Sequence, residues 1–235
     1  MRIPANEPID TQNFVLKKTP IVFGVVILAA GASTRMGRCK LLLPWGDKTI
    51  LTHLLDEWRS AGAAQIAPVI DPANELLRKA LADAGFSRSG WIENPSAQLG
   101  MFSSVREASR WTGWLSTLTH WVIALGDQPH IHISTLRLLL DTARKNPAHI
   151  CQPALHGRAR HPIVLPASNF RELAQSDTAD LRAYIQTHEA LRLRVSVEDP
   201  AVSEDLDTPE DYARRKPNEP TESRSLRSIQ VLARE

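Results

Sequence analysis

The chain has 235 residues, 43% of them hydrophobic and 23% charged, and a formal net charge of +2 at pH 7. This length allows one sizeable core, and the near-neutral charge, with basic residues scattered among acidic ones, argues against nucleic-acid binding. Because no apolar run approaches the roughly 20 residues of a transmembrane helix, no secretion signal is present and only two distant cysteines occur, we expect a cytoplasmic protein with no membrane partner.

The first predicted elements follow a polar, proline-containing stretch at residues 1–20, which we expect to be an N-terminal extension. Residues 21–28 are continuously apolar, which predicts a central strand buried on both faces. Residues 49–62 carry apolar side chains at i, i+1, i+4, i+5 and i+8, which indicates an amphipathic helix that ends near Gly62. A strand at 64–70, a helix at 72–84 with a proline near its start and a short strand at 91–92 follow.

Strands and helices continue to alternate through the second half of the chain. The predicted strands are residues 121–125, 149–153, 163–165 and 191–197, and the predicted helices are residues 101–111, 134–144 and 180–187. Ser134 is the candidate N-cap of its helix, and Thr208, followed by a proline and two acidic residues, is predicted to cap a last short helix. We expect residues 216–235, which are rich in Pro, Glu, Ser and Arg, to form a flexible C-terminal tail.

This alternation predicts an α/β fold. We expect a single Rossmann-like, three-layer domain over residues 21–215, with a mostly parallel, mixed central sheet and right-handed crossovers. In such a sheet the ligand binds at the carboxyl ends of the strands, where Ala30 and Asp127 are predicted to emerge.

Residues 26–46 read VILAAGASTRMGRCKLLLPWG and are the most informative run of the chain. A buried strand leads into a small loop with Ala29, Ala30 and Gly31, and two cations, Arg35 and Lys40, follow. A tight loop after a strand presents backbone N–H groups to phosphate oxygens, and fixed cations beside it neutralise the remaining charge. The run therefore predicts a nucleoside triphosphate ligand.

Two commoner phosphate loops do not fit this run. The Walker pattern needs four residues before Gly-Lys-Ser/Thr, whereas five residues separate Gly31 from Gly37 and Arg38-Cys39 comes next. The dinucleotide fingerprint needs a second glycine where Ser33 stands, and an acidic residue about 20 positions further on. The missing fingerprint argues against an NAD(P)-dependent reductase.

The run does resemble the nucleotidyltransferase signature L-A-A-G-x-x-x-R-M-G-x-x-K-L-L-L-P. Further segments resemble motifs of the same family in the same order, namely Asn94-Pro95 with Gly100-Met101, residues 125–129 (LGDQP), residues 161–164 (HPIV) and residues 205–211 (DLDTPED). The chain is thus similar to the MobA-like NTP transferases, nearest the molybdenum cofactor cytidylyltransferases. The resemblance implies the nucleotide-diphospho-sugar transferase type of α/β fold, Mg²⁺ as cofactor, CTP and a molybdopterin-type phosphorylated acceptor as substrates, and a molybdenum hydroxylase as the enzyme served.

Nucleotidyl transfer requires that two polyanions are held in line and that charge on the leaving pyrophosphate is stabilised. Lys40, Arg35 and Asp127 are the catalytic candidates. Lys40 is expected to stabilise the developing charge and Arg35 to hold the β- or γ-phosphate. Asp127 is also the first candidate metal ligand, and the resemblance adds Asp207 as the second. Each of these residues also has a structural alternative. Asp127 could cap the next helix, and Asp207 could simply precede the Thr208 cap. Arg35 and Lys40 could be exposed cations on a polar loop.

The nucleotide-binding candidates are Ala29, Ala30, Gly31, Arg35, Lys40, Gln98, Gly100 and Ser103. In the resembled family the L-A-A-G sequence accompanies cytosine, whereas the guanylyl branch has L-A-G-G, so Ala30 favours CTP. The acceptor-binding candidates are Arg160, His161 and Asp205, and a purely structural hairpin is the alternative for the first two.

One segment departs from the family pattern. The family usually has G-D-x-G-x-R where residues 176–182 read SDTADLR, so both glycines are missing and the loop is expected to follow a different path. This departure puts the acceptor in question more than the nucleotide. Guanylyl transfer, a sugar- or alditol-phosphate acceptor, and a non-catalytic chaperone that carries a nucleotide cofactor are the alternatives.

Overall fold

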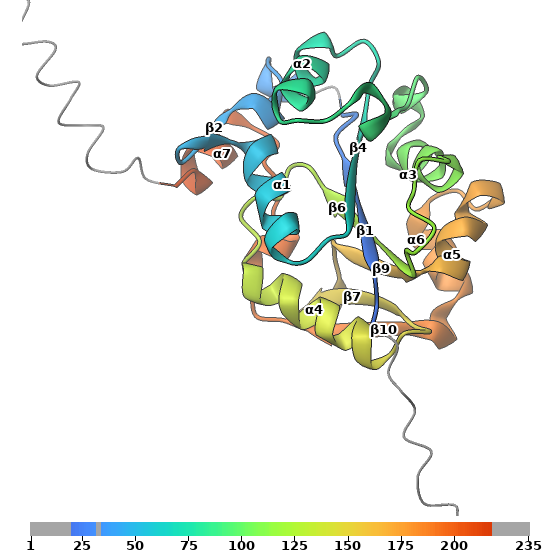
Figure 1. Cartoon of the computed structure of the whole chain (residues 1–235). Coiled ribbons are helices and arrows are strands. Elements are labelled where there is room, and N and C mark those ends of the chain that lie inside the picture. The colour runs from blue at the N-terminus through green and yellow to red at the C-terminus, as the bar shows by residue number, and fades with distance from the viewer. Residues whose placement is uncertain (1–19, 32–33, 218–235) are drawn as a thin grey trace, which may run out of the picture.

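The computed structural model describes residues 20–31 and 34–217 (Figure 1). Apart from Pro20, Lys216 and Pro217, the predicted N-terminal extension and C-terminal tail lie outside the described residues, as do Ala32 and Ser33 of the predicted phosphate loop. Within the described ranges, no helix has both the length and the apolar character required to cross a membrane.

A mixed sheet, eight-stranded over the described residues, forms the centre of the molecule in the order β10-β7-β9-β6-β1-β4-β5, with β8 paired to β7. Its strands are β1 (Phe23–Leu28), β4 (Gln65–Ile70), β5 (Ile92–Glu93), β6 (His120–Leu125), β7 (Ile150–Leu155), β8 (Arg158–Ala159), β9 (Ile163–Pro166) and β10 (Arg192–Ser196). β1 runs parallel to both β4 and β6, whereas β9 runs antiparallel to β6 and β7. The predicted mostly parallel, mixed sheet is therefore confirmed.

Helices cover both faces of this sheet (Figure 1). One layer contains α1 (Ile50–Ser60), α2 (Glu75–Asp83) and α4 (Ile133–Lys145), and the other contains α3 (Met101–Arg110), α5 (Ala167–Glu172) and α6 (Leu181–Thr187). Because side chains alternate along a strand, Val25 and Ile27 of β1 pack in the core beneath α1 while Val26 packs beneath α3. Burial on both faces explains the continuously apolar sequence of β1, and the three layers are as predicted.

The start of α4 differs from the prediction. Its N-cap residue is His132, which makes no side-chain cap, and Ser134 lies inside the helix. The Asp199 carboxylate takes the capping role, because Oδ2 accepts from the His132 N–H at 3.0 Å and from the Thr135 hydroxyl at 2.8 Å. A carboxylate distant in sequence thus satisfies the donors at this end, and the prediction of Ser134 as the cap is wrong.

Other differences concern short elements. α2 begins at Glu75 rather than near Pro72, because the Asn74 side chain accepts the Leu77 N–H and sets the helix start there. The sequence also did not predict α5 or the small hairpin of β2 (Pro44–Trp45) and β3 (Lys48–Thr49). Such elements are too short to leave a periodic apolar pattern.

Candidate functional site

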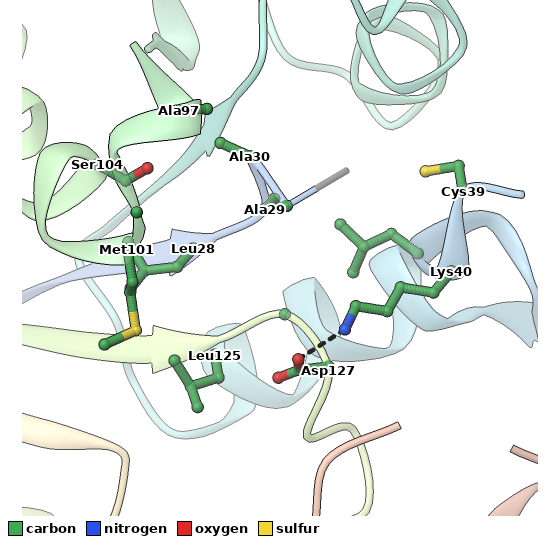
Figure 2. A pocket seen from close by; sticks show the side chains of 14 residues that line it. Leu28, Ala29, Ala30, Cys39, Lys40, Ala97, Met101, Ser104, Leu125 and Asp127 are labelled. Carbon is green, nitrogen blue, oxygen red and sulfur yellow. Dashed lines mark hydrogen bonds and ion pairs between the residues drawn. The ribbon is translucent and has the colours of Figure 1, made fainter. Parts of the chain in front are cut away.

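Lys40 and Asp127 meet at the carboxyl edge of the sheet. The parallel register of β1 and β6 places Leu28 opposite Leu125, so the loops after both strands leave the sheet side by side. Lys40 begins a short 3₁₀ helix after the first loop, and its Nζ lies 2.6 Å from Oδ2 of Asp127 (Figure 2). Their side chains are only 17% and 21% exposed, so solvent and salt screen this ion pair weakly.

Asp207 brings a third segment of the chain to the same point. Its Oδ1 lies 3.6 Å from Nζ of Lys40, and its Oδ2 lies 3.0 Å from a guanidinium nitrogen of Arg35. Lys40 Nζ also donates to the Leu206 carbonyl at 3.4 Å, and the Leu206 N–H donates to the Asp127 carbonyl at 3.0 Å. Two cations and two carboxylates from distant segments therefore form one cluster.

A capped helix holds Asp207 in place. Thr208 is the N-cap of α7 (Pro209–Arg215), as predicted: its hydroxyl accepts the Asp211 N–H, and the Asp211 carboxylate accepts the Thr208 N–H. The Tyr212 hydroxyl donates to the Pro44 carbonyl at 2.6 Å, which joins α7 to the hairpin after the phosphate loop. Asp207 therefore directly precedes a fixed helix start.

Asp205 fixes the turn that contains Asp127 through a hydrogen bond to Gln128. Its Oδ1 accepts from Nε2 of Gln128 at 3.0 Å, and Gln128 is almost fully buried. Burial, and then the nearby charge of Asp127, raises the pKa of Asp205. Asp205 lines neither of the two cavities described below, so the structure does not bring it together with the other predicted acceptor-binding residues.

A cavity of about 280 Å³ opens beside the Lys40–Asp127 pair (Figure 2). Its walls come from the end of β1, the loop after β6, the start of α3 and the turn before it. The lining residues are Leu28, Ala29, Ala30, Gly31, Cys39, Lys40, Leu41, Ala97, Gly100, Met101, Ser104, Leu125, Gly126 and Asp127. Figure 2 shows Lys40 reaching toward Asp127 from the side opposite Met101 and Ser104. Most of the predicted nucleotide-binding residues thus surround one space.

Arg35, Gln98 and Ser103 are predicted nucleotide-binding residues that do not line this cavity. Gln98 belongs to the 3₁₀ turn Ala97–Leu99, of which only Ala97 reaches the cavity. The Ser103 hydroxyl donates to the Gly100 carbonyl at 2.7 Å and accepts from the Asn94 amide at 2.8 Å, so it fixes the loop before α3. Ser104, one position further along α3, lines the cavity instead. Successive residues of a helix point in different directions, so the position of each serine relative to the first residue of α3 was the signal that could have distinguished them.

A second cavity, of about 660 Å³, adjoins the first at Met101, which lines both. Arg160 and His161 line it, so these two predicted acceptor-binding residues lie together after the β7–β8 hairpin. Nδ1 of His161 lies 3.3 Å from the Ile123 carbonyl, and burial lowers the pKa of this histidine. Nε of Arg160 is buried, and nothing among the described residues accepts a hydrogen bond from it.

Sequence reasoning missed four further arginines that line the second cavity, which are Arg158, Arg182, Arg192 and Arg194. Alternation was an available signal, because residues i and i+2 of a strand face the same side. Arg192 and Arg194 stand at that spacing on β10, and Arg158 precedes Arg160 by two positions. Arg182 comes from the start of α6, within the segment that departs from the family pattern.

Comparison with known proteins agrees with this geometry. The family described as MobA-like NTP transferase domain matches residues 25–192. The chain is 27% identical to the molybdenum cofactor cytidylyltransferase of Escherichia coli over 192 residues, which cover 81% of this chain and 94% of that protein. It is 28% identical to the nicotine blue oxidoreductase of Paenarthrobacter nicotinovorans over 205 residues, which cover 83% and 96% of the two proteins.

Other matches extend the same fold. The bifunctional protein GlmU of Nitrosomonas europaea is 33% identical over 148 residues, or 60% of this chain, and the matched part spans only 31% of that longer protein. The crystal structure of Rv0371c from Mycobacterium tuberculosis aligns with a TM-score of 0.61 at 28% identity, covering 83% of this chain and 98% of that one. Solved nucleotidyltransferases below 20% identity share the fold as well, which confirms the predicted nucleotide-diphospho-sugar transferase type.

Proposed function

The chain belongs to the MobA-like NTP transferase family, and we propose that it is a Mg²⁺-dependent cytidylyltransferase. In this proposal CMP passes from CTP to the terminal phosphate of a molybdopterin-type cofactor, and pyrophosphate leaves. The observation that carries it is the convergence of Lys40, Asp127 and Asp207 beside a cavity at the carboxyl ends of β1 and β6. This is the position in an open α/β sheet where a nucleotide binds.

In this proposal the base and the phosphates of the nucleotide lie at different walls of the first cavity. Ala30 and Ala97 provide small, apolar walls for a base, while Lys40 stands across the cavity where phosphates would lie. Arg35 is more exposed than Lys40, since 68% of its side chain is accessible. This exposure supports a role for Arg35 at the β- or γ-phosphate, away from the buried pair. The sequence L-A-A-G at residues 28–31 favours cytosine over guanine in the family that the chain resembles.

Asp127 and Asp207 are suited to hold Mg²⁺ in this proposal. Both carboxylates lie within 4 Å of the Lys40 ammonium group, so their oxygens face a region that favours positive charge. Mg²⁺ prefers oxygen donors and is usually held by one or two carboxylates together with substrate phosphates. When bound, the ion would neutralise phosphate charge and orient the α-phosphate.

The reaction itself asks little covalent work of the protein. An oxygen of the acceptor phosphate attacks the α-phosphorus, and the bond from that phosphorus to the β-phosphate oxygen breaks. Lys40 and Asp127 both line the first cavity, and in this proposal Lys40 turns from Asp127 toward the oxygen that gains charge. The acceptor would enter through the second cavity, whose arginines suit a phosphorylated molecule.

The decisive test is pyrophosphate release with Mg²⁺ and molybdenum cofactor, comparing CTP, GTP and ATP. Turnover with CTP alone supports the proposal, whereas turnover with GTP would move the protein to guanylyl transfer. Tight CTP binding without turnover would mean either that the proposed acceptor is wrong or that the protein is a non-catalytic carrier. Failure to bind any of the three nucleotides would overturn the proposal.

One relative bears the name of an oxidoreductase, so that activity needs its own test. The loop after β1 lacks the dinucleotide fingerprint, and we therefore expect no binding of NADPH. A fluorescence titration with NADPH measures this directly. Saturable binding at micromolar concentrations would favour a reductase over a nucleotidyltransferase.

A further inference from the structure

The second cavity is unusually rich in arginine. Of the described residues, Arg158, Arg160, Arg182, Arg192 and Arg194 line it, and no acidic residue does. Arginine presents a planar fork of donors that matches carboxylate and phosphate oxygens. The cavity is therefore built for an anion, and the number of guanidinium groups indicates how much negative charge it can accept.

Few of these charges are neutralised by the protein. Arg192 and Arg194 share one carboxylate, that of Glu189, at 3.0 Å and 2.7 Å. Within residues 20–31 and 34–217 no ion pair involves Arg158, Arg160 or Arg182. One carboxylate against five guanidinium groups leaves a large positive excess, more than a single phosphate dianion would balance.

The arginines also lie on two sides of β7. Arg160 directly precedes His161, which contacts the Ile123 carbonyl of β6, the strand that leads to Asp127. Arg192 and Arg194 lie on β10, which pairs with one edge of β7. The Arg160 N–H donates to the Pro153 carbonyl of β7 at 2.8 Å from the other edge, where β8 pairs. At strand spacings of about 4.8 Å, the backbones of Arg160 and of β10 are therefore about 10 Å apart.

The outer arginines are held in fixed positions. Nε of Arg192 donates to Oε1 of Gln152 at 2.8 Å, and Gln152 is itself buried on β7. The parallel register sets Arg194 opposite Gln152, so both arginines project from an ordered part of the sheet. A volume of about 660 Å³ also lies in the range of small-molecule sites and exceeds what one phosphate fills.

Resting on the proposed function, we infer that the acceptor carries two anionic groups, the attacking phosphate near Arg160 and a second anion held by Arg192 and Arg194. The acceptor is then a phosphorylated small molecule with a further phosphate, carboxylate or comparable anionic centre at its opposite end. Arg182 adds a fifth guanidinium from the altered loop: Asp180 caps α6 by accepting the Ala183 N–H at 2.7 Å, which places Arg182 in the first turn.

Two matched probes test this inference by isothermal titration of the full chain. The probes are hexyl phosphate and the hexane bisphosphate that carries a phosphate at each end. The bisphosphate is expected to bind the unaltered protein at least about 10-fold more tightly, because it engages charge-assisted bonds at both ends. Arg194→Gln is expected to remove this advantage while it leaves affinity for hexyl phosphate within about 2-fold.

Arg192→Gln is the second variant at the outer end, because Arg194→Gln alone leaves one guanidinium group there. Arg160→Gln is expected to weaken the binding of both probes by the same factor. Arg137→Gln, an exposed position on α4 that removes the same charge away from the cavity, is the matched control. Equal affinity of the two probes, or an advantage that survives in both outer variants, would overturn the inference.

The function is tested separately by CTP binding and turnover in the same preparations. If CTP reacts but the probes bind alike, the two-anion inference fails and the transferase proposal stands. If the probes differ but CTP does not bind, the cavity keeps its preference and the transferase proposal fails.

Discussion

Nζ of Lys40 lies 2.6 Å from Oδ2 of Asp127, although the two residues are 87 positions apart in the sequence. The pair closes the junction between the loops that follow β1 and β6, and both side chains are largely buried. Removing one member of such a pair takes away the nearest opposite charge of the other, which costs more than removing both. The effects of single and double substitutions therefore differ in a way that can be measured.

Asp127→Asn is expected to lower the rate of CTP-dependent pyrophosphate release by about 100-fold or more, since it removes a carboxylate that would hold Mg²⁺ beside the reacting phosphates. The fold is expected to persist, because the amide keeps the shape of the carboxylate. Asp56→Asn is the matched control, since Asp56 forms an exposed ion pair with Lys48 away from the cavity. Unchanged turnover in Asp127→Asn would contradict the catalytic role proposed for Asp127.

Lys40→Gln is expected to weaken CTP binding by about 10- to 100-fold, the range of one hydrogen bond to a charged group. Lys48→Gln removes the same charge at an exposed site and is expected to leave binding unchanged. Urea unfolding is expected to show that Lys40→Gln with Asp127→Asn destabilises the protein by less than the sum of the two single variants. Strict additivity would contradict the coupling that the 2.6 Å pair implies.

Much of the fold could be predicted from the sequence, because its main elements are long enough to carry a period. The continuous apolar run of β1 corresponds to burial of the strand on both faces, and the apolar stripe of α1 corresponds to burial of one face of the helix. Ser134 shows where this reasoning ends. The donors at the start of α4 are satisfied by Asp199, which comes from a later loop, and local sequence cannot reveal a distant partner.

The candidate site divides in the same way. Lys40 and Asp127 belong to short contiguous motifs, and the mostly parallel sheet that the sequence predicted suffices to place them at one edge. The arginines of the second cavity come from β8, β10, α6 and the loop after β8, and each alone resembles an ordinary surface cation. The spacing of Arg192 and Arg194 indicates only that these two share a face of β10. The packing of the separate segments makes all five one surface, and a local pattern does not reveal that packing.

Thr208→Ala is expected to destabilise the protein by about 1 kcal/mol, because it removes the side chain that accepts the Asp211 N–H at the start of α7. For a chain of this size the melting temperature should fall by about 2–4 °C. Turnover should also fall, since Asp207 directly precedes the cap. Thr142→Ala, a change at a half-buried position near the end of α4, is the control and should not lower the melting temperature. An unchanged melting temperature in Thr208→Ala would contradict the capping role.

Glu57 makes stability depend on pH. Burial in α1 raises its pKa from 4.5 to about 7. Between these values the folded chain holds a proton that the unfolded chain has released, so the free energy of unfolding falls as pH rises and levels off above about pH 7. His53 lies 3.5 Å away, and burial lowers its pKa, so it does not compensate by becoming charged near neutral pH.

Glu57→Gln should remove this dependence, because glutamine keeps the shape of the side chain but cannot ionise. Near pH 4.5 the variant and the original protein should be about equally stable. At pH 8 the variant should be more stable by about 1–3 kcal/mol, a range reduced from the full pKa shift because the side chain is 21% exposed. Urea unfolding of both proteins across this pH range measures the difference. A difference that does not change with pH would show that Glu57 ionises in the folded protein as it does in water.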